Sequence, residues 1–437
     1  MRRYLYIIMA MALLFVSCSD KDGEFYEEGG SGEEQQQQTD TDDSDEQVND
    51  HDDDIVEQTT IMYFMGTSLK SNYFDRYNIP DTQSAVASGA LGSNGRLLIF
   101  MPNISNATLY EIYQTSGGYA TETIATFEDG YNYKSFSTTP ANLVDVIEKS
   151  QEYAPAKRYN LILSGHGTGW VLQSHPRLRS IDTELFSWEK RDNVDVETRF
   201  FGGSIDGYME VTEFREALEQ ISTKFGYILF DMCFMSNIET IYELKDLCDN
   251  VVASPCEVMG YGYPYQTILP QLFTDDGKNY DLEGACLAFY EFYDNLSNYP
   301  SGAVALCQTA NLERLASVLK RINESGVNSV DINDLQCYEN LASNVFCDLW
   351  HYVNEACVDS SLLSEFNSAM DLAFPVKYHT DQFYTGLSYS DSVWESGRTY
   401  WVDIDDTTFS GVSTTEPSTK FTDEWVETSW AVATMAN

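Results

Sequence analysis

The chain has 437 residues, and 69 acidic residues against 25 Lys and Arg give it a formal net charge of −44. A charge of this sign and size excludes a general nucleic-acid binder, because contacts to phosphates need Lys and Arg side chains. The length is sufficient to bury a large core and would allow about two or three domains.

Residues 1–18 have the pattern of a bacterial export signal. Two arginines precede a short apolar run from Tyr4 to Val16. This run is shorter than the roughly 20 apolar residues that a transmembrane helix needs, so a membrane-spanning helix is the weaker interpretation. Phe15-Val16-Ser17-Cys18 resembles a lipoprotein processing site, in which Cys18 receives lipid and becomes the first residue of the mature protein.

Residues 19–58 are predicted to form an acidic, disordered tether. The first 39 of them hold 17 acidic residues and one basic residue, Lys21, and such a composition has too little apolar surface to offset the entropy of ordering. The acidic spacing does not follow a calcium-loop motif. Ser19-Asp20-Lys21-Asp22 is similar to the acidic signal that sends Bacteroidetes lipoproteins to the outer face of the outer membrane. We therefore expect an outer-membrane lipoprotein at the cell surface of a Gram-negative bacterium.

From residue 59 on, short apolar runs that predict strands alternate with segments that have helical spacing. This alternation predicts an α/β core of βαβ units with a mainly parallel sheet over residues 59–270. The expected strands are 61–65, 96–101, 159–164, 227–231 and 251–254, the expected helices are 141–150, 211–221 and 238–249, and residues 107–127 are expected to form an inserted hairpin.

Residues 271–437 are predicted to be a helical and mixed region that completes or flanks this core. Its expected helices are 282–296, 312–323 and 335–354, and its expected strands are 303–308, 383–388 and 400–403. Its tryptophans suit a core better than a carbohydrate-binding surface. Cys337, Cys347 and Cys357 lie close enough in sequence to allow one local disulfide.

The segment around Cys233 combines a buried strand with a reactive side chain. Tyr227 to Phe230 is an unbroken apolar run that suits a strand covered on both faces. Ser236 and Glu239 have capping-box spacing, which predicts a helix that begins just past Cys233. A helix N-terminus favours the thiolate of a nearby cysteine. The alternative is a buried, inert thiol.

His166 has matching surroundings, unlike the other four histidines. It lies in the glycine-rich turn Ser164 to Gly169, directly after a predicted strand. Functional groups collect at the carboxyl ends of the strands in open α/β sheets, so we expect His166 and Cys233 on one rim. A histidine in a turn can also be an ordinary hydrogen-bonded surface residue, but two strand ends with complementary chemistry favour a catalytic pair.

An apolar strand that ends in His166-Gly167 and a second that ends in Asp231-Met232-Cys233 resemble the clostripain family of cysteine peptidases, within the caspase-like clan. The segments Thr60–Met65, Gly207–Phe214 and Ala253–Tyr265 fit as well, so the resemblance covers roughly residues 58 to 400. It implies a caspase-like fold, a mostly parallel sheet with helices on both faces, and a thiol protease acting on proteins or peptides.

The resemblance also implies roles for single residues. The Cys233 thiolate would attack the scissile carbonyl, His166 would protonate the leaving amine, and the Gly167 and Cys233 N–H groups would form the oxyanion hole. No cofactor is required for this chemistry. Calcium dependence is known in the family, but no metal site can be named from this sequence.

Asp231 and Glu257 are the candidate substrate-binding residues. Asp231 lies two residues before the nucleophile, so period-two geometry directs it to the same side as Cys233. A carboxylate there would pair with Arg or Lys, a preference that the family associates with this position. The alternatives are an Asp231 that merely caps the neighbouring helix, and a preference for Asp or Asn as in caspases and legumains.

Residues 175–200 are expected to be an exposed loop above the rim, or an ordinary solvated insertion. We hypothesise that this loop covers the site of a zymogen, and that the enzyme cuts itself at one of the basic residues Arg177, Arg179, Lys190 and Arg191. The competing function is a catalytically inactive caspase-like surface lipoprotein that acts as a binding or adhesion protein.

Overall fold

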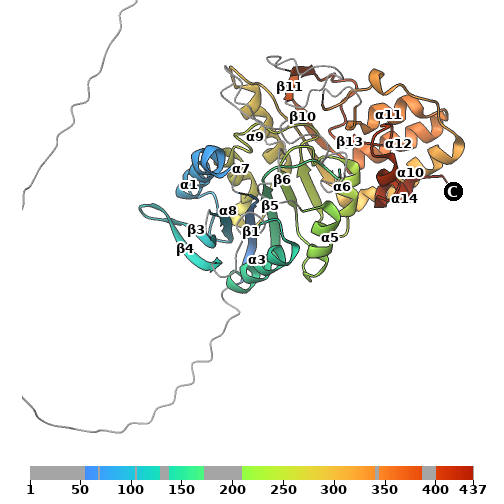
Figure 1. Ribbon diagram of the computed structural model, residues 1–437. Coiled ribbons are helices and arrows are strands. Elements are labelled where there is room, and N and C mark those ends of the chain that lie inside the picture. The colour runs from blue at the N-terminus through green and yellow to red at the C-terminus, as the bar shows by residue number, and fades with distance from the viewer. Residues whose placement is uncertain are drawn as a thin grey trace, which may run out of the picture. The chain divides into compact units, whose positions relative to one another are not determined.

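The computed structural model describes residues 55–66, 69–103, 106–127, 137–171, 209–339, 344–385 and 400–436. Within these residues, a nine-stranded sheet runs through the centre in the order β10-β8-β7-β6-β5-β1-β2-β3-β4 (Figure 1). Its strands are β1 (Val56–Phe64), β2 (Gly95–Pro102), β3 (Ala107–Thr115), β4 (Gly118–Phe127), β5 (Ala156–Ser164), β6 (Ile228–Asp231), β7 (Asn250–Ala253), β8 (Ala303–Gln308) and β10 (Val376–His379).

The middle of this sheet is parallel and its two edges are antiparallel. Strands β2, β1, β5, β6 and β7 pair in parallel, as the apolar runs predict. The hairpin expected over residues 107–127 forms as β3 and β4, but it extends the sheet beside β2 instead of standing as an insertion. At the other edge, β8 and β10 continue the same sheet, so residues after 271 contribute to it directly.

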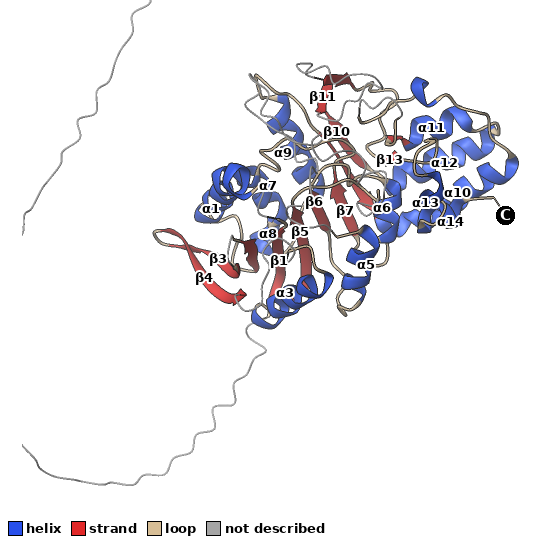
Figure 2. Ribbon diagram, viewed as in Figure 1, coloured by secondary structure: helices blue, strands red, loops and turns tan. Residues whose placement is uncertain are grey.

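Helices cover both faces of the sheet (Figure 2). One apolar cluster joins the sheet to α1, α7 and α9, and the cluster on the opposite face joins it to α3, α5, α6, α10, α12 and α14. The fold class inferred from the sequence is therefore confirmed. The α-helices are α1 (Ile79–Ala87), α3 (Pro140–Tyr153), α5 (Val211–Glu219), α6 (Ile238–Glu243), α7 (Tyr265–Leu272), α8 (Thr274–Gly277), α9 (Leu282–Asp294), α10 (Leu312–Ser325), α11 (Leu349–Ala356), α12 (Ser360–Ala373), α13 (Thr422–Trp425) and α14 (Ser429–Thr434).

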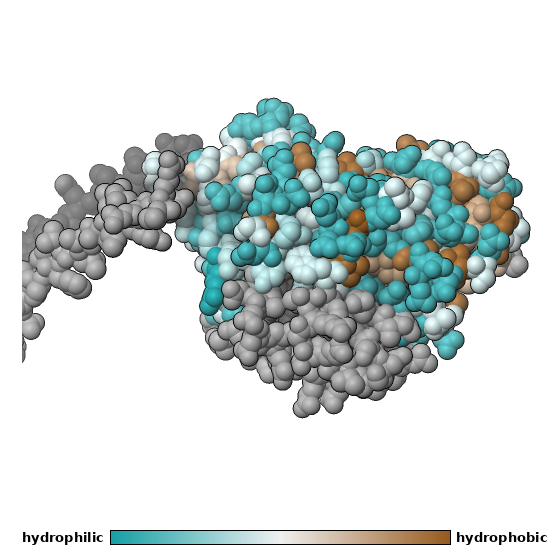
Figure 3. Space-filling view, turned by 90° about the horizontal axis from the view of Figure 1, so that it is seen from above, coloured by the Kyte–Doolittle hydropathy of each residue, from teal (hydrophilic) through white to brown (hydrophobic). Residues whose placement is uncertain are grey.

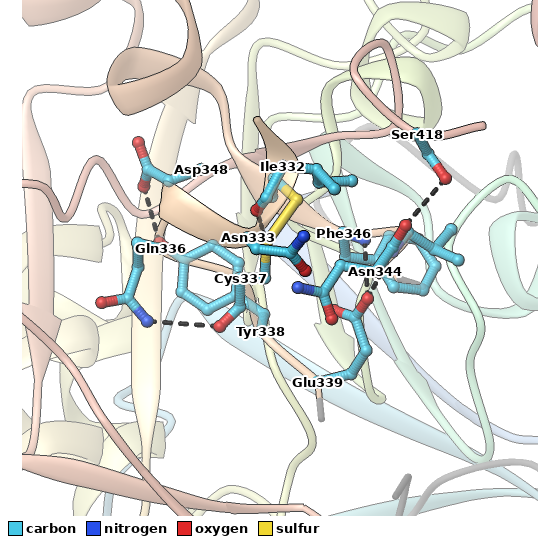
Figure 4. Close-up of a disulfide and its surroundings, with 12 residues drawn as sticks. Ile332, Asn333, Gln336, Cys337, Tyr338, Glu339, Asn344, Phe346, Asp348 and Ser418 are labelled. Atoms are coloured by element: carbon cyan, nitrogen blue, oxygen red, sulfur yellow. Dashed lines mark hydrogen bonds between the residues drawn. A yellow bond between two sulfur atoms is a disulfide. The ribbon is translucent and has the colours of Figure 1, made fainter. Parts of the chain in front are cut away.

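Shorter elements complete the fold, most of them in the C-terminal region. The helix expected over residues 335–354 is wrong in its first half, because Cys337 forms a disulfide with Cys347 there (Figure 4). Helix α11 begins only at Leu349, where the Asp348 carboxylate accepts a hydrogen bond from the His351 N–H. The remaining elements are β9 (Cys347–Asp348) paired with β13 (Ser413–Thr414), β11 (Gln382–Thr385) paired with β12 (Tyr400–Asp403), a π-helix η2 (Lys70–Asn78), and the 3-10 helices η3 (Thr309–Asn311) and η4 (Ile332–Asp334).

The described tryptophans near the C-terminus belong mainly to the core. Trp425 and Trp430 are buried in the cluster beside α6 and α10, as expected, while Trp401 is half-buried and Trp394 lies outside the described residues. On the face seen in Figure 3 the described surface is mainly hydrophilic, with small scattered hydrophobic patches.

Two carboxyl groups, those of Glu239 and Glu416, lie close together beside the C-terminal segment that follows β13. Glu239 in α6 is fully buried, and Glu416, which follows β13, is half-buried but its carboxyl atom Oε2 is covered. Burial raises the pKa of Glu416 from 4.5 to about 7, and the neighbouring charge of Glu239 acts in the same direction. The native state therefore binds this proton more tightly than the unfolded chain does, so stability falls as the pH rises from about 4.5 to about 7.

Replacing Glu416 by Gln should therefore stabilise the protein above pH 7 and have little effect near pH 4.5. The gain is the cost of ionising a buried carboxyl, on the order of 3 kcal/mol at most. Thermal unfolding midpoints of wild type and E416Q, measured from pH 4.5 to 8, test this. The exposed Glu427→Gln change is the matched control, and equal shifts in both variants would contradict the prediction.

Candidate active site

The two candidate catalytic residues follow neighbouring parallel strands. Strand β5 ends at Ser164 and β6 ends at Asp231, and these two residues are register partners. His166 and Cys233 each lie two residues beyond their strand, at the same carboxyl edge of the sheet. The pairing of β5 with β6 therefore brings together two side chains that are 67 residues apart in sequence.

Gly167 is where the two loops touch. A Cβ atom at this position would lie 2.5 Å from the carbonyl oxygen of Cys233 and 3.1 Å from the Cβ of Met232, so a larger residue would push the loops apart. Two residues earlier, the Gly165 N–H donates a hydrogen bond of 3.4 Å to the Asp231 carbonyl. The histidine loop is thus packed against the backbone of the cysteine loop, and His166 is half-buried at this contact.

The Cys233 thiol is buried and is held by a third segment. Its Sγ lies 3.2 Å from the Val258 backbone N–H, which donates to it, and 3.7 Å from the Val258 carbonyl oxygen, which can accept the thiol proton. This N–H holds the sulfur in place and would stabilise a negative charge on it, while the burial of the thiol acts in the opposite direction. The sequence gives no sign of this donor, because Val258 is an ordinary apolar residue in a predicted loop.

The capping box predicted after Cys233 does not form. Helix α6 begins at Ile238, and its cap is Asn237, whose side chain accepts a hydrogen bond from the Thr240 N–H. Ser236 donates instead to the Gly411 carbonyl, and Glu239 is buried among residues of the C-terminal segment. Cys233 is therefore several residues away from a six-residue helix, and the helix dipole contributes less at this thiol than expected.

Asp231 is fully buried and hydrogen-bonded through both carboxylate oxygens. Oδ2 accepts from the Ser164 hydroxyl at 3.0 Å and from the Tyr265 hydroxyl at 2.9 Å, and Oδ1 accepts from the Tyr263 N–H at 3.1 Å. The two tyrosines belong to the apolar cluster of one face, while Cys233 packs in the cluster of the other. The period-two direction expected from the strand does not continue past Asp231, because the chain turns there.

Glu257, the second candidate for substrate binding, is also fully buried. Its Oε1 accepts a hydrogen bond of 2.6 Å from the Thr385 hydroxyl at the end of β11. Glu257 directly precedes Val258, so it belongs to the segment that holds the Cys233 sulfur. The structure thus places both acidic candidates and the thiol around the same loops.

Phe346 is a neighbour of the site that the sequence did not indicate. Its ring stacks on that of Phe234, the residue after the nucleophile, with centroids 4.9 Å apart and planes 16° apart. The only available signal was the local cysteine pair, Cys337 and Cys347, which places a covalent link beside it.

Several predicted residues lie outside the described part of the chain. These are the lipidation candidate Cys18 and the cleavage candidates Arg177, Arg179, Lys190 and Arg191. Among the residues that the structure describes, no group of three or more His, Cys, Asp or Glu is arranged to hold a metal ion. In the same described set, no helix has the length and apolar character needed to cross a membrane.

Comparison with known proteins places this geometry in a family. A model of the clostripain family, C11 peptidases, matches residues 71–370. Clostripain from Hathewaya histolytica is 26% identical over 262 residues, which cover 52% of this chain and 47% of clostripain, so the match spans about half the length of that relative.

Solved structures extend the likeness over most of the chain. Iotapain, a secreted C11 cysteine protease from Bacteroides thetaiotaomicron, superposes with a TM-score of 0.71 at 31% identity, over 87% of this chain and 99% of iotapain. An inactive zymogen of a C11 protease from Parabacteroides distasonis gives a TM-score of 0.69 at 21% identity with the same coverage, 87% and 99%. The chain therefore belongs to the clostripain family of cysteine peptidases.

Proposed function

We propose that the protein is a cysteine endopeptidase in which Cys233 is the nucleophile and His166 is the general acid. The observation that carries the proposal is the close contact of the two loops at Gly167, which joins the histidine turn to the backbone of the nucleophile. A thiol and an imidazole at one strand edge are sufficient for acyl transfer, and the chemistry needs no cofactor.

Each group has a defined role in this mechanism. The Cys233 thiolate attacks the scissile carbonyl carbon, and the N–H groups of Gly167 and Cys233 stabilise the resulting oxyanion, an interaction of roughly 3 kcal/mol per donor. The C–N bond then breaks while His166 gives its proton to the leaving amine. Water hydrolyses the thioester and regenerates the thiol.

Asp231 supports a preference for Arg or Lys before the cleaved bond. Its carboxylate accepts hydrogen bonds from the Ser164 and Tyr265 hydroxyls and from the Tyr263 N–H, which hold it at the end of β6. A carboxylate at this strand end is a suitable partner for a cationic substrate side chain. Glu257 would add a second negative charge from the neighbouring segment.

The buried thiol supports a latent form of the enzyme. Cys233 has no exposed surface, so a substrate carbonyl cannot reach its sulfur without a rearrangement. We propose that the rearrangement follows self-cleavage after Arg177, Arg179, Lys190 or Arg191. A relative with the same fold is described as an inactive zymogen.

The N-terminal pattern supports a lipid anchor at Cys18 and a location on the outer face of the outer membrane. The acidic segment is predicted to reach residue 58, but β1 begins at Val56, so the tether is the part of the segment before this strand. That part would repel itself and extend, which would hold the peptidase away from the membrane surface.

Purified protein should hydrolyse fluorogenic peptides that end in Arg or Lys, and a thiol alkylator or the Cys233→Ala change should abolish turnover. His166→Ala should lower kcat by at least about a hundredfold, since it removes the proton donor. The assay is run with CaCl2 and with EDTA because the family resemblance implies a calcium effect. A folded wild type that stays inactive after exposure to trypsin would instead favour the inactive binding protein.

Replacing Asp231 by Asn should lower kcat/KM for Arg and Lys substrates by about 30-fold or more, because a charge-assisted contact of roughly 2 kcal/mol is lost. Glu257→Gln should have a smaller effect in the same direction. The rate of Cys233 alkylation, measured in parallel, controls for the integrity of the site. An unchanged preference in a mixed peptide library would contradict the role of Asp231, and a preference for Asp or Asn would replace it.

Mass spectrometry of protein purified from the membrane fraction of a lipoprotein-processing host tests maturation. The N-terminal fragment should begin at a lipid-modified Cys18, and wild type should show a cut after one of the four basic residues of the 175–200 loop. The Cys233→Ala protein should carry the lipid but remain uncut until active wild type is added. An intact wild-type chain would exclude self-cleavage, and an unmodified Cys18 would exclude the anchor.

A further inference from the structure

The residue directly after the nucleophile has an unusual backbone conformation. Phe234 is fully buried and has a φ of +59°, in the left-handed region that bulky side chains rarely adopt. Such a conformation persists only where the surrounding structure imposes it, and it is frequent at functional sites. The peptide that precedes it contains the Cys233 carbonyl, whose oxygen contacts Gly167.

Phe346 contacts both loops of the site. Its ring stacks on Phe234, and a Cβ atom at Gly169 would lie 3.2 Å from the Phe346 ring and 3.0 Å from the Phe234 carbonyl oxygen. Gly169 lies three residues after His166 in the same turn. A single aromatic ring therefore packs against the nucleophile loop and the histidine loop together.

Phe346 is itself held by the residues around the disulfide (Figure 4). The Cys337–Cys347 bond links the neighbouring residue to the chain ten positions earlier. Across this link the Tyr338 N–H donates to the Phe346 carbonyl at 2.9 Å, and Glu339 Oε1 accepts from the Phe346 N–H at 3.2 Å and from the Val345 N–H. We call residues 337–339 and 344–347 the clamp.

We propose that Phe346 is a positioning residue. The clamp holds its ring against Phe234, which keeps the Cys233 carbonyl oxygen in contact with Gly167 and so fixes the Gly167 N–H of the oxyanion hole relative to Cys233. The proposal rests on the peptidase function proposed above. Phe346 acts through Phe234 and Gly169, so its loss should affect the chemical step more than substrate binding.

The test compares Phe346→Ala with wild type after activation. We expect kcat to fall by about 10- to 100-fold while KM changes less than about twofold, and Phe346→Tyr, which keeps the ring, to restore most of kcat. The Cys337→Ala/Cys347→Ala double variant should lower kcat in the same manner. Alkylation of Cys233 by iodoacetamide should be affected much less, because that reaction needs no oxyanion hole.

Two further variants separate positioning from general stability. Phe366→Ala removes a buried ring of the same kind from α12, which contributes to neither the histidine loop nor the nucleophile loop, and should lower the unfolding temperature without changing kcat of the folded protein. Adding Phe234→Gly to Phe346→Ala should raise kcat above that of Phe346→Ala alone, because glycine adopts the left-handed conformation without a clamp.

The outcomes distinguish this proposal from the function on which it rests. An active wild type with Phe346→Ala of equal kcat would overturn the positioning role and leave the peptidase intact. Equal losses in Phe346→Ala and Phe366→Ala would also overturn it, since both would then reflect stability. A wild type without alkylation-sensitive turnover would instead remove the peptidase function itself.

Discussion

The contact between Gly167 and the carbonyl of Cys233 is the constraint on which the site depends. Strands β5 and β6 determine where along the sheet this contact forms, because Ser164 and Asp231 are register partners at the ends of adjacent parallel strands. His166 and Cys233 each lie two residues beyond their strand, and neighbouring strands are about 4.8 Å apart. A side chain at position 167 would occupy the space that the Cys233 oxygen already fills. The relative position of His166 and Cys233 therefore depends on the register of β5 and β6 and on a glycine at position 167.

Residues of the C-terminal region form hydrogen bonds to the loop that follows Cys233. The Ser236 hydroxyl donates to the Gly411 carbonyl at 2.6 Å, and the Ser413 N–H donates to the Ser236 carbonyl at 2.9 Å. The Leu349 N–H donates in turn to the Val412 carbonyl at 3.0 Å, which ties the start of α11 to the same segment. Since β8 and β10 also extend the central sheet, residues after 271 stabilise the nucleophile loop as well as the core.

The strands, and the position of His166 and Cys233 at one edge of the sheet, could be predicted because they depend on local signals. Apolar runs that end in His166-Gly167 and in Asp231-Met232-Cys233 identify strand ends, and parallel pairing does the rest. The cap of α6 could not be predicted, because Ser236 and Glu239 form hydrogen bonds with residues far along the chain. Ser236 bonds to Gly411, and Glu239 bonds to Thr414 and Thr415. The clamp could not be predicted from the sequence for a similar reason. Residues 335–346 have helical spacing, but a disulfide and a short strand override that propensity.

The hydrogen-bond donors around the acidic side chains of the core differ from residue to residue. At Asp231, donors reach both carboxylate oxygens. In Glu239 and Glu416 one oxygen, Oε2, is buried without a hydrogen-bond partner. Burial therefore raises the pKa of both of these carboxyls, in Glu416 to about 7. These hydrogen bonds hold the Asp231 carboxylate in one orientation at the end of β6, whereas Glu239 and Glu416 take up protons more readily, which suits them to close packing beside the C-terminal segment.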